Sequence, residues 1–141
     1  MSEAIADARA ALPLMRLLRI GLHSQGEAIA MMRSDCQVCR SEGLHARARV
    51  EIDSGGRRIT ARWLRSVDGT RAVVEMAESS GLSRVAPGER DAVHATSTGL
   101  GDLLATVAAT GVRDVILGIG GSATTDGGFG MLASLGMGST P

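Results

Sequence analysis

Hydrophobic and polar positions follow clear patterns in the second half of the chain, and these patterns predict its elements. Residues 58–64 alternate as an exposed strand would, and residues 71–76 (R-A-V-V-E-M) form a more apolar strand. Asp68 and Gly69 lie between the two segments and have the composition of a tight turn. We therefore expect the two strands to form a hairpin.

A helix, a strand and a glycine-rich segment are predicted to follow. Apolar residues recur at helical spacing within residues 99–110, and Gly111 is placed to end that helix. Residues 112–117 form a run typical of a buried parallel strand. A glycine-rich loop begins at residue 118, and the residues after Asp126 are expected to open another helix. This order of elements predicts an α/β fold.

The pattern before Gly55 is weaker. Residues 2–12 predict a short helix, and residues 25–33 are also helix-like. Residues 14–20 form an interrupted apolar run that could be a strand, and residues 45–52 alternate as a strand would. We therefore divide the chain into residues 1–55 and residues 56–141.

The balance of charge excludes some classes of function. Fifteen basic residues balance fifteen acidic ones, which argues against a nucleic-acid-binding domain and against a polybasic membrane anchor. No apolar run approaches the roughly 18 residues of a membrane span. The N-terminus lacks the pattern of a secretory signal, so we expect a cytoplasmic protein.

The chain contains no lysine, because all fifteen basic residues are arginine. A P-loop, which needs a lysine, is therefore excluded. Any phosphate chemistry must use arginine, backbone N–H groups or metal ions.

Cysteine is limited to Cys36 and Cys39. In a cytoplasmic chain this pair favours metal or redox use over a disulfide framework. His23 or His45 could complete a zinc site, but the second close pair of ligands is missing, so we assign none. His94 lies in a predicted loop, and we expect a surface residue there rather than a general base.

The glycine-rich loop G-I-G-G-S-A-T-T-D-G-G-F-G-M, residues 118–131, carries the candidate chemistry. It follows a predicted parallel strand at the carboxyl end, where open α/β sheets bind ligands. Glycines let backbone N–H groups approach an anion closely, and the next helix N-terminus adds partial positive charge. Asp126 could hold Mg²⁺ or accept a proton from an attacking hydroxyl. With the hydroxyls of Ser122 and Thr124, these are parts for phosphoryl transfer.

A structural alternative stays open for the same loop. A strand followed by glycines is often only a tight turn, and Asp126 could merely cap the next helix. The loop also departs from the G-x-G-x-x-G fingerprint, since Ala123 stands at its final position. If Asp126 is catalytic, we expect Asp126→Asn to abolish turnover while leaving the fold intact.

Three segments, in order, resemble the large two-domain family of bacterial glycerate kinases. Residues 118–131 resemble that family's G-[IL]-G-G-S-A-T-x-D-G-G-x-G-M. Residues 72–82 (A-V-V-E-M-A-E-S-S-G-L) resemble A-x-x-E-M-A-x-A-S-G-L. Residues 90–91 and 95–104 (A-T-S-T-G-L-G-D-L-L) resemble R-x-P followed by T-T-S-x-G-x-G-E-L-I. The resemblance covers residues 56–141.

The resemblance implies a fold and an activity. The family uses ATP and Mg²⁺ to phosphorylate D-glycerate to phosphoglycerate, so it implies a kinase acting on an alcohol group, with ATP and glycerate as small-molecule partners. Its fold pairs a flavodoxin-like domain with a second α/β domain. The chain is then expected to be an α/β protein and an incomplete portion of that two-domain fold.

The resemblance also suggests roles for individual residues. Asp126, Ser122 and Thr124 are the candidate catalytic residues, with Asp126 also the candidate metal ligand. The candidate cofactor-binding residues are Gly118, Gly120, Gly121, Thr96, Ser97, Gly99 and Gly101. The candidate substrate-binding residues, where a strand is expected to pass into a loop, are Glu75, Ser79 and Ser80. Two alternatives stay open: Glu75 could be a solvent-facing strand residue, and Thr96 and Ser97 could simply cap a helix.

The chain departs from the family in two places. Residues 19–26 can be laid over the family's P-x-A-D-G-G-E-G loop, but its acidic residues and two of its glycines are replaced. Alternatively, residues 13–54 do not correspond to the family, as after a frame slip. The chain also ends at Pro141 where family proteins continue, so we expect a truncated chain.

Two other functions therefore stay open. The chain could be a non-catalytic remnant with at most weak nucleotide or anion binding. It could also be an α/β module that binds a nucleotide or sugar phosphate and is unrelated to kinases.

Overall fold

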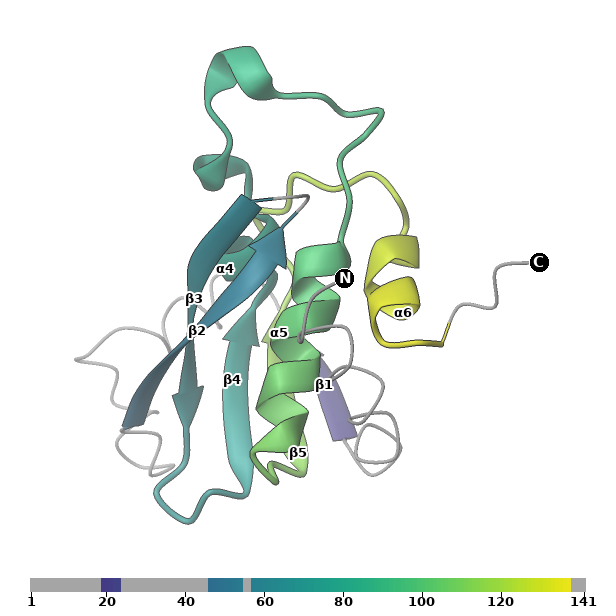
Figure 1. The fold of residues 1–141 in the computed structure, drawn as a ribbon. Helices are drawn as coiled ribbons and strands as arrows, with labels where there is room; N and C mark the ends of the chain where they lie inside the picture. The colour runs from purple at the N-terminus through teal and green to yellow at the C-terminus, as the bar shows by residue number, and fades with distance from the viewer. Residues whose placement is uncertain (1–18, 24–45, 55–56, 138–141) are drawn as a thin grey trace.

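The structure is a computed structural model that describes residues 19–23, 46–54 and 57–137. These residues form a small mixed α/β domain around a five-stranded sheet of order β1-β5-β4-β3-β2 (Figure 1). The strands are β1 (Arg19–His23), β2 (Ala46–Ser54), β3 (Arg57–Arg65), β4 (Arg71–Glu75) and β5 (Asp114–Gly118). The α-helices are α4 (Met76–Ser80), α5 (Thr98–Ala109) and α6 (Phe129–Ser134), and the 3₁₀ helices are η1 (Leu82–Arg84) and η2 (Pro87–Glu89).

Strands β2, β3 and β4 are antiparallel neighbours, and β3 and β4 correspond to the strands predicted at residues 58–64 and 71–76. Gly69 has a φ of 74° in the turn between β3 and β4, and the Ser66 N–H donates to the carbonyl oxygen of Arg71 at 2.9 Å. Only glycine adopts such a φ without strain, so the turn composition sets the predicted hairpin. That hairpin is confirmed.

Strand β5 lies between β1 and β4 and is parallel to both, as its apolar composition predicts. In this register His23 and Glu75 are the partners of Gly118 on either side. All three residues end their strands, so they mark the carboxyl edge of the parallel part of the sheet. The glycine-rich loop leaves from this edge.

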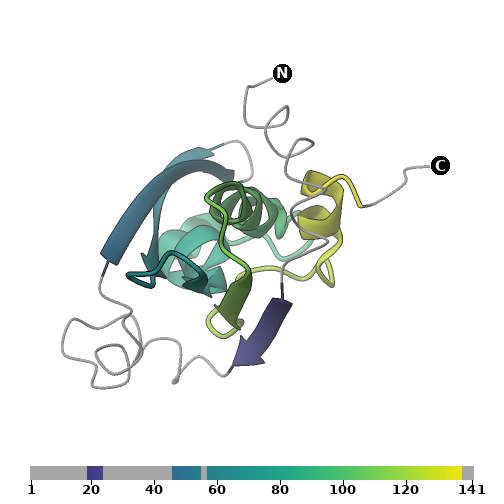
Figure 2. The same cartoon turned by 90° about the horizontal axis from the view of Figure 1, so that it is seen from below.

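Helix α5 covers one face of the sheet, and α6 lies next to α5 (Figures 1 and 2). Side chains from the strands and from α5 share a buried core, which includes Trp63, Val74, Val115, Leu117, Leu100, Leu103, Leu104 and Val107. Gly111 has a φ of 86° immediately after the helix, as expected of a glycine that ends one. The predicted helix is therefore confirmed.

A glycine sets the contact between the two helices. A Cβ atom at Gly101 would lie 2.6 Å from the Met131 carbonyl oxygen and 2.7 Å from the Ser134 Cβ. Any larger side chain there would push α6 away from α5. This explains Gly101 by close packing, and its candidate role in cofactor binding remains a prediction.

Two local expectations are wrong. Residues 76–80 were expected to leave a strand and enter a loop, but they form helix α4. Met, Ala and Glu are good helix formers, and Glu78 anchors the helix by pairing with Arg62 of β3. Residues 19–23, which can be laid over a loop of the family, form strand β1 instead, and the first two of them belong to the apolar run at residues 14–20 that could be a strand.

Other expectations fall partly outside the described residues. The predicted helices at residues 2–12 and 25–33 lie outside them, as do Cys36, Cys39 and His45. Strands β1 and β2 join the same sheet as β3–β5, and the division of the chain at Gly55 stays a prediction. Among the described helices, none is long and apolar enough to cross a membrane.

Candidate functional site

Two of the motif segments meet at the carboxyl edge of the sheet. The Ala123 N–H donates to the Ser80 carbonyl oxygen at 2.8 Å, and the Leu82 N–H donates to the Gly121 carbonyl oxygen at 2.9 Å. An isolated β-bridge joins Gly81 to Ser122 between them. The glycine-rich loop is therefore tied to the end of α4 by backbone hydrogen bonds.

Glycine is required on both sides of this junction. A Cβ atom at Gly81 would lie 2.2 Å from the Ala77 carbonyl oxygen, so a side chain would collide with the helix it follows. Gly121 has a φ of 71°, which favours glycine. The structure therefore needs glycine at positions 81 and 121 for steric reasons, whether or not these residues also bind a ligand.

Asp126 connects the N-termini of α5 and α6. Its Oδ2 accepts hydrogen bonds from the Ser97 N–H at 2.8 Å, the Ser97 hydroxyl at 2.9 Å and the Gly130 N–H at 3.0 Å. The Thr96 hydroxyl donates to the same oxygen at 3.2 Å, and the Gly128 N–H donates to Oδ1 at 3.1 Å. We call this set of five residues (Thr96, Ser97, Asp126, Gly128 and Gly130) the Asp126 junction.

The junction fixes the charge state of Asp126. Partial burial would raise the pKa of this carboxyl, but the hydrogen bonds from Ser97, Gly130 and Gly128 outweigh it and lower the pKa to about 2. So acidic a group is a poor proton acceptor at neutral pH. The helix-capping alternative therefore accounts for Asp126, whose catalytic and metal-binding roles remain predictions.

The junction also occupies the hydroxyl groups that begin α5. Ser97 is fully buried, and its Oγ donates to Asp126 and accepts from the Met131 N–H at 2.9 Å. Its side chain caps neither end of α5, because both partners belong to the α6 segment. The Thr96 hydroxyl lies 2.8 Å from that of Thr98. Gly99 lies buried in the first turn of α5, and the cofactor-binding roles of Thr96, Ser97 and Gly99 remain predictions.

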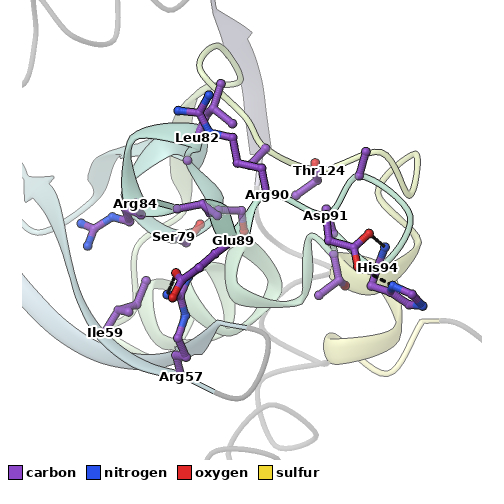
Figure 3. A pocket seen from close by; sticks show the side chains of 17 residues that line it. Arg57, Ile59, Ser79, Leu82, Arg84, Glu89, Arg90, Asp91, His94 and Thr124 are labelled. Carbon is purple, nitrogen blue, oxygen red and sulfur yellow. Dashed lines mark hydrogen bonds and ion pairs between the residues drawn. The ribbon is translucent and has the colours of Figure 1, made fainter. Parts of the chain in front are cut away.

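A pocket of about 430 Å³ opens beside the junction of the two motif segments (Figure 3). Of the candidate residues, four line it: Ser79, Ser80, Thr96 and Thr124. Arg90 and Thr124 lie on one side of the pocket in Figure 3, and Arg57 and Ile59 lie on the opposite side. The other candidate residues lie outside the lining: Glu75, Ser97, Gly99, Gly101, Gly118, Gly120, Gly121, Ser122 and Asp126.

The hydroxyl groups of the glycine-rich loop mainly bond to each other. The Ser122 Oγ lies 2.8 Å from the Thr124 Oγ1 and accepts from the Thr124 N–H at 3.0 Å. Thr124 lines the pocket, whereas Ser122 does not. Thr124 is thus the catalytic candidate that contacts the pocket, and the reaction role of either residue stays a prediction.

Most charged residues of the pocket come from residues 84–94, of which the third motif segment includes Arg90 and Asp91. Arg84, Glu89, Arg90, Asp91 and His94 all line it. His94 is exposed, as expected, and its Nδ1 lies 2.7 Å from the Asp91 Oδ2. These residues were not named as candidates from the sequence, and the motif match at residues 90–91 is the signal that could have found Arg90 and Asp91.

A buried carboxylate cluster lies behind the pocket. Glu78, only 6 % exposed, accepts hydrogen bonds from the Arg62 Nε at 3.0 Å and from the Arg84 Nη2 at 2.9 Å. Burial would raise the Glu78 pKa, but these arginines lower it. Glu75 is also buried, so its solvent-facing alternative is wrong, and burial with the nearby Glu78 charge raises the Glu75 pKa.

We expect Glu78→Gln to lower the free energy of unfolding by about 1–2 kcal/mol at neutral pH, because a neutral amide bonds arginine more weakly. The Glu78 pKa is lowered by folding, so its stabilisation is present above the unfolded pKa and is lost as pH falls. The difference between the two proteins should therefore shrink in acid. Urea denaturation followed by circular dichroism at neutral and acid pH measures both effects.

Glu89→Gln is the matched control for this prediction. Glu89 pairs with Arg57 at 3.5 Å on the exposed surface, where an ion pair contributes about 0–1 kcal/mol. If the two variants lost the same free energy of unfolding, the buried Glu78 would stabilise the fold no more than an exposed carboxylate does.

The donor set suits phosphate better than a bound metal. Among residues 57–137, no three His, Cys, Asp or Glu side chains gather as metal ligands. Asp126 is a single carboxylate whose Oδ2 is already saturated by hydrogen bonds. Arginines, hydroxyl groups and backbone N–H groups are instead the usual partners of phosphate oxygens.

Comparison with known families identifies a match over most of the chain. The family model described as the glycerate kinase family matches residues 34–140. The chain is 46 % identical over 81 residues to the glycerate 2-kinase of Escherichia coli (strain K12), covering 57 % of this chain and 21 % of that protein. It is 53 % identical over 72 residues to the glycerate kinase of Haemophilus influenzae, covering 51 % of this chain and 19 % of that protein.

A solved structure agrees with these matches. The chain superposes on a crystal structure assigned as glycerate kinase 2 from Salmonella typhimurium LT2 with a TM-score of 0.68 and 33 % sequence identity. The superposition covers 94 % of this chain and 37 % of that one. The chain spans about a fifth of the length of the curated relatives it matches.

Proposed function

The chain belongs to the glycerate kinase family, and we propose that it carries part of the site at which D-glycerate is phosphorylated by ATP. One observation carries this proposal. The glycine-rich loop and the end of α4, far apart in the sequence, are joined by backbone hydrogen bonds beside a pocket lined by hydroxyl groups and arginines. Such a pocket at the carboxyl edge of parallel strands is where α/β proteins bind ligands.

The proposed reaction is a phosphoryl transfer. A hydroxyl oxygen of glycerate forms a bond to the γ-phosphorus of ATP, the bond from that phosphorus to the β-phosphate oxygen breaks to release ADP, and the hydroxyl proton passes to solvent water. Catalysis of such a step is mainly positioning and neutralisation of charge. Thr124 and the backbone of the glycine-rich loop are proposed to orient phosphate oxygens, and Ser79 and Ser80 to contact the acceptor.

Asp126 is proposed to position the residues of this site rather than to contact the substrates. It holds the start of α5 against the start of α6, so it fixes the far end of the loop that carries Thr124. Mg²⁺ is proposed to arrive with ATP, bound mainly by phosphate oxygens and water, which suits its preferred ligands. Glycines 118, 120 and 121 are proposed to let the loop approach the nucleotide.

A coupled assay of ADP release tests the proposal. We expect the folded chain to release ADP when given ATP, Mg²⁺ and D-glycerate, and not when glycerol replaces glycerate. We expect Thr124→Val to lower this rate about tenfold or more, because it removes a hydroxyl at the pocket. A cooperative unfolding transition in circular dichroism establishes that the protein assayed is folded.

The alternative is a non-catalytic protein that binds a nucleotide or an anion weakly and transfers no phosphoryl group. The low pKa of Asp126 favours it, because the residue that the motif suggests as a proton acceptor is already committed to hydrogen bonds. Folded chain that binds ATP in calorimetry but releases no glycerate-dependent ADP would establish this alternative and contradict the kinase activity.

A further inference from the structure

The pocket takes one of its walls from a single segment, residues 85–95, which includes η2. Val85, Glu89 and Ala95 are among the lining residues that it supplies. In Figure 1 the segment belongs to the arch above the sheet, between η1 and the start of α5. None of its residues is buried, and Val93 is 85 % exposed. The segment therefore contributes no side chain to the hydrophobic core.

Both ends of this segment are anchored in buried hydrogen bonds. Immediately before it, the Arg84 Nη2 donates to the buried Glu78 at 2.9 Å. Shortly after it, the N–H and the hydroxyl of the fully buried Ser97 donate to Asp126. A segment that is anchored at both ends and buries nothing between them can open locally at low cost, without unfolding of the domain.

Two contacts join the segment to the walls across the pocket. The Arg57 Nη1 lies 3.5 Å from the Glu89 Oε2, and both side chains are more than half exposed (Figure 3). On the other side, the Thr125 hydroxyl of the glycine-rich loop donates to the Ala92 carbonyl oxygen. One contact is an ion pair with the start of β3, and the other is a neutral hydrogen bond.

We propose that residues 85–95 are a lid over the pocket, held closed by the Arg57–Glu89 ion pair and by the Thr125–Ala92 hydrogen bond. Opening breaks these two contacts and leaves the anchors at Arg84 and Ser97 in place, so the sheet and α5 stay folded. The lid then controls access to a pocket of about 430 Å³. It would serve any ligand of this pocket, so it stands independently of the proposed phosphoryl transfer.

Limited digestion of the full 141-residue chain with trypsin, without added ATP or glycerate, tests the lid. Trypsin cleaves after arginine and needs an extended, accessible chain. Arg90 lies in the lid, whereas Arg113 is exposed between α5 and β5 and its N–H donates to the Thr70 carbonyl oxygen at 2.8 Å.

The rate of cleavage at each bond is measured by mass spectrometry and divided by the rate for the same bond in a synthetic peptide. When the lid opens and closes faster than trypsin cleaves, this ratio follows the population of the open lid. We expect the ratio to be much higher after Arg90 than after Arg113, because the second bond is exposed only when part of the sheet opens.

Two variants each remove one of the closing contacts. Arg57→Gln should raise cleavage after Arg90 by about two- to fivefold, as expected for loss of an exposed ion pair. Thr125→Val should raise it by about two- to tenfold, as expected for loss of one hydrogen bond. Neither variant should change cleavage after Arg113 or the urea midpoint of unfolding. Arg58→Gln, an exposed arginine outside the pocket lining, is the matched control and should behave as the unchanged chain does.

Salt distinguishes the two contacts, because it screens an exposed ion pair and has little effect on a neutral hydrogen bond. Raising sodium chloride from about 0.05 to about 0.5 M should increase cleavage after Arg90 in the unchanged chain and in Thr125→Val. The same change should have no effect in Arg57→Gln, which has already lost the ion pair.

An increase that is confined to the bond after Arg90 supports the lid. The lid is overturned if Arg57→Gln or Thr125→Val leaves that rate unchanged, or if cleavage after Arg113 rises by the same factor, because the whole domain would then be opening. Release of ADP in the kinase assay bears on neither result, so the lid and the proposed function can fail separately.

Discussion

Asp126→Asn is expected to lower the free energy of unfolding by about 2–3 kcal/mol, since it weakens a charged helix cap and leaves buried donors unmatched. The asparagine keeps the shape of the side chain but has one oxygen and no charge. Its amide nitrogen would face either the Gly128 N–H or the donors on Oδ2, which come from Ser97, Gly130 and Thr96. Urea denaturation of the two proteins measures the difference.

The matched control for this variant is Asp91→Asn. Asp91 also accepts backbone hydrogen bonds, from the N–H groups of Val93 and His94, but it is exposed and all its partners lie within its own loop. We expect this change to cost much less stability than Asp126→Asn, because Asp91 is exposed and connects no two helices. If both variants lost the same stability, the Asp126 junction would not be a link between α5 and α6.

The pH dependence gives a second readout for Asp126. Its pKa in the folded protein is lowered to about 2, so its contribution to stability is present above the unfolded pKa of about 4. That contribution is lost as pH falls through the window from about 4 to about 2. The stability difference between the unchanged chain and Asp126→Asn should therefore narrow over this window.

The elements that local patterns define were predictable. The hairpin β3–β4 follows from an alternating segment, an apolar segment and the turn glycine Gly69, and α5 follows from its apolar spacing and Gly111. Each of these features is encoded by residues that lie close together in the sequence. Helix α4 was missed because its serines and the following Gly81 resemble a loop, and because Arg62, which anchors it, lies far away along the chain.

The sequence predicts which segments form the candidate site, but it does not predict the hydrogen bonds between their side chains. The three motif segments identify which parts of the chain meet, and the structure brings the 80–82 and 118–126 segments together. No periodicity in the sequence tells that Ser97 bonds Asp126 and Met131, which lie 29 and 34 residues away. The same limit hid the ion pairs of the pocket, because no local pattern shows that Arg57 pairs with Glu89 or that Arg84 pairs with Glu78.

Gly130→Ala is the substitution that tests this contact network most directly, and we expect it to cost about 3 kcal/mol of stability through overpacking. A Cβ atom at this buried position would lie 2.2 Å from the Thr96 Oγ1 and 2.8 Å from both the Asp126 Oδ2 and the Thr98 Oγ1. Threonine side chains are stiff at χ1, so the clash cannot be relieved without moving the start of α5.

Gly88→Ala provides the control, since a Cβ atom there would have nothing within 4 Å and the backbone φ is not positive. It should leave the free energy of unfolding within about 0.5 kcal/mol of the unchanged chain, or raise it slightly by restricting the unfolded state. Because Gly130 and Asp126 belong to one junction, the double variant Gly130→Ala/Asp126→Asn should lose less stability than the sum of the two single losses. Full additivity in that cycle, or equal behaviour of the two glycine variants, would contradict a single junction that positions the glycine-rich loop.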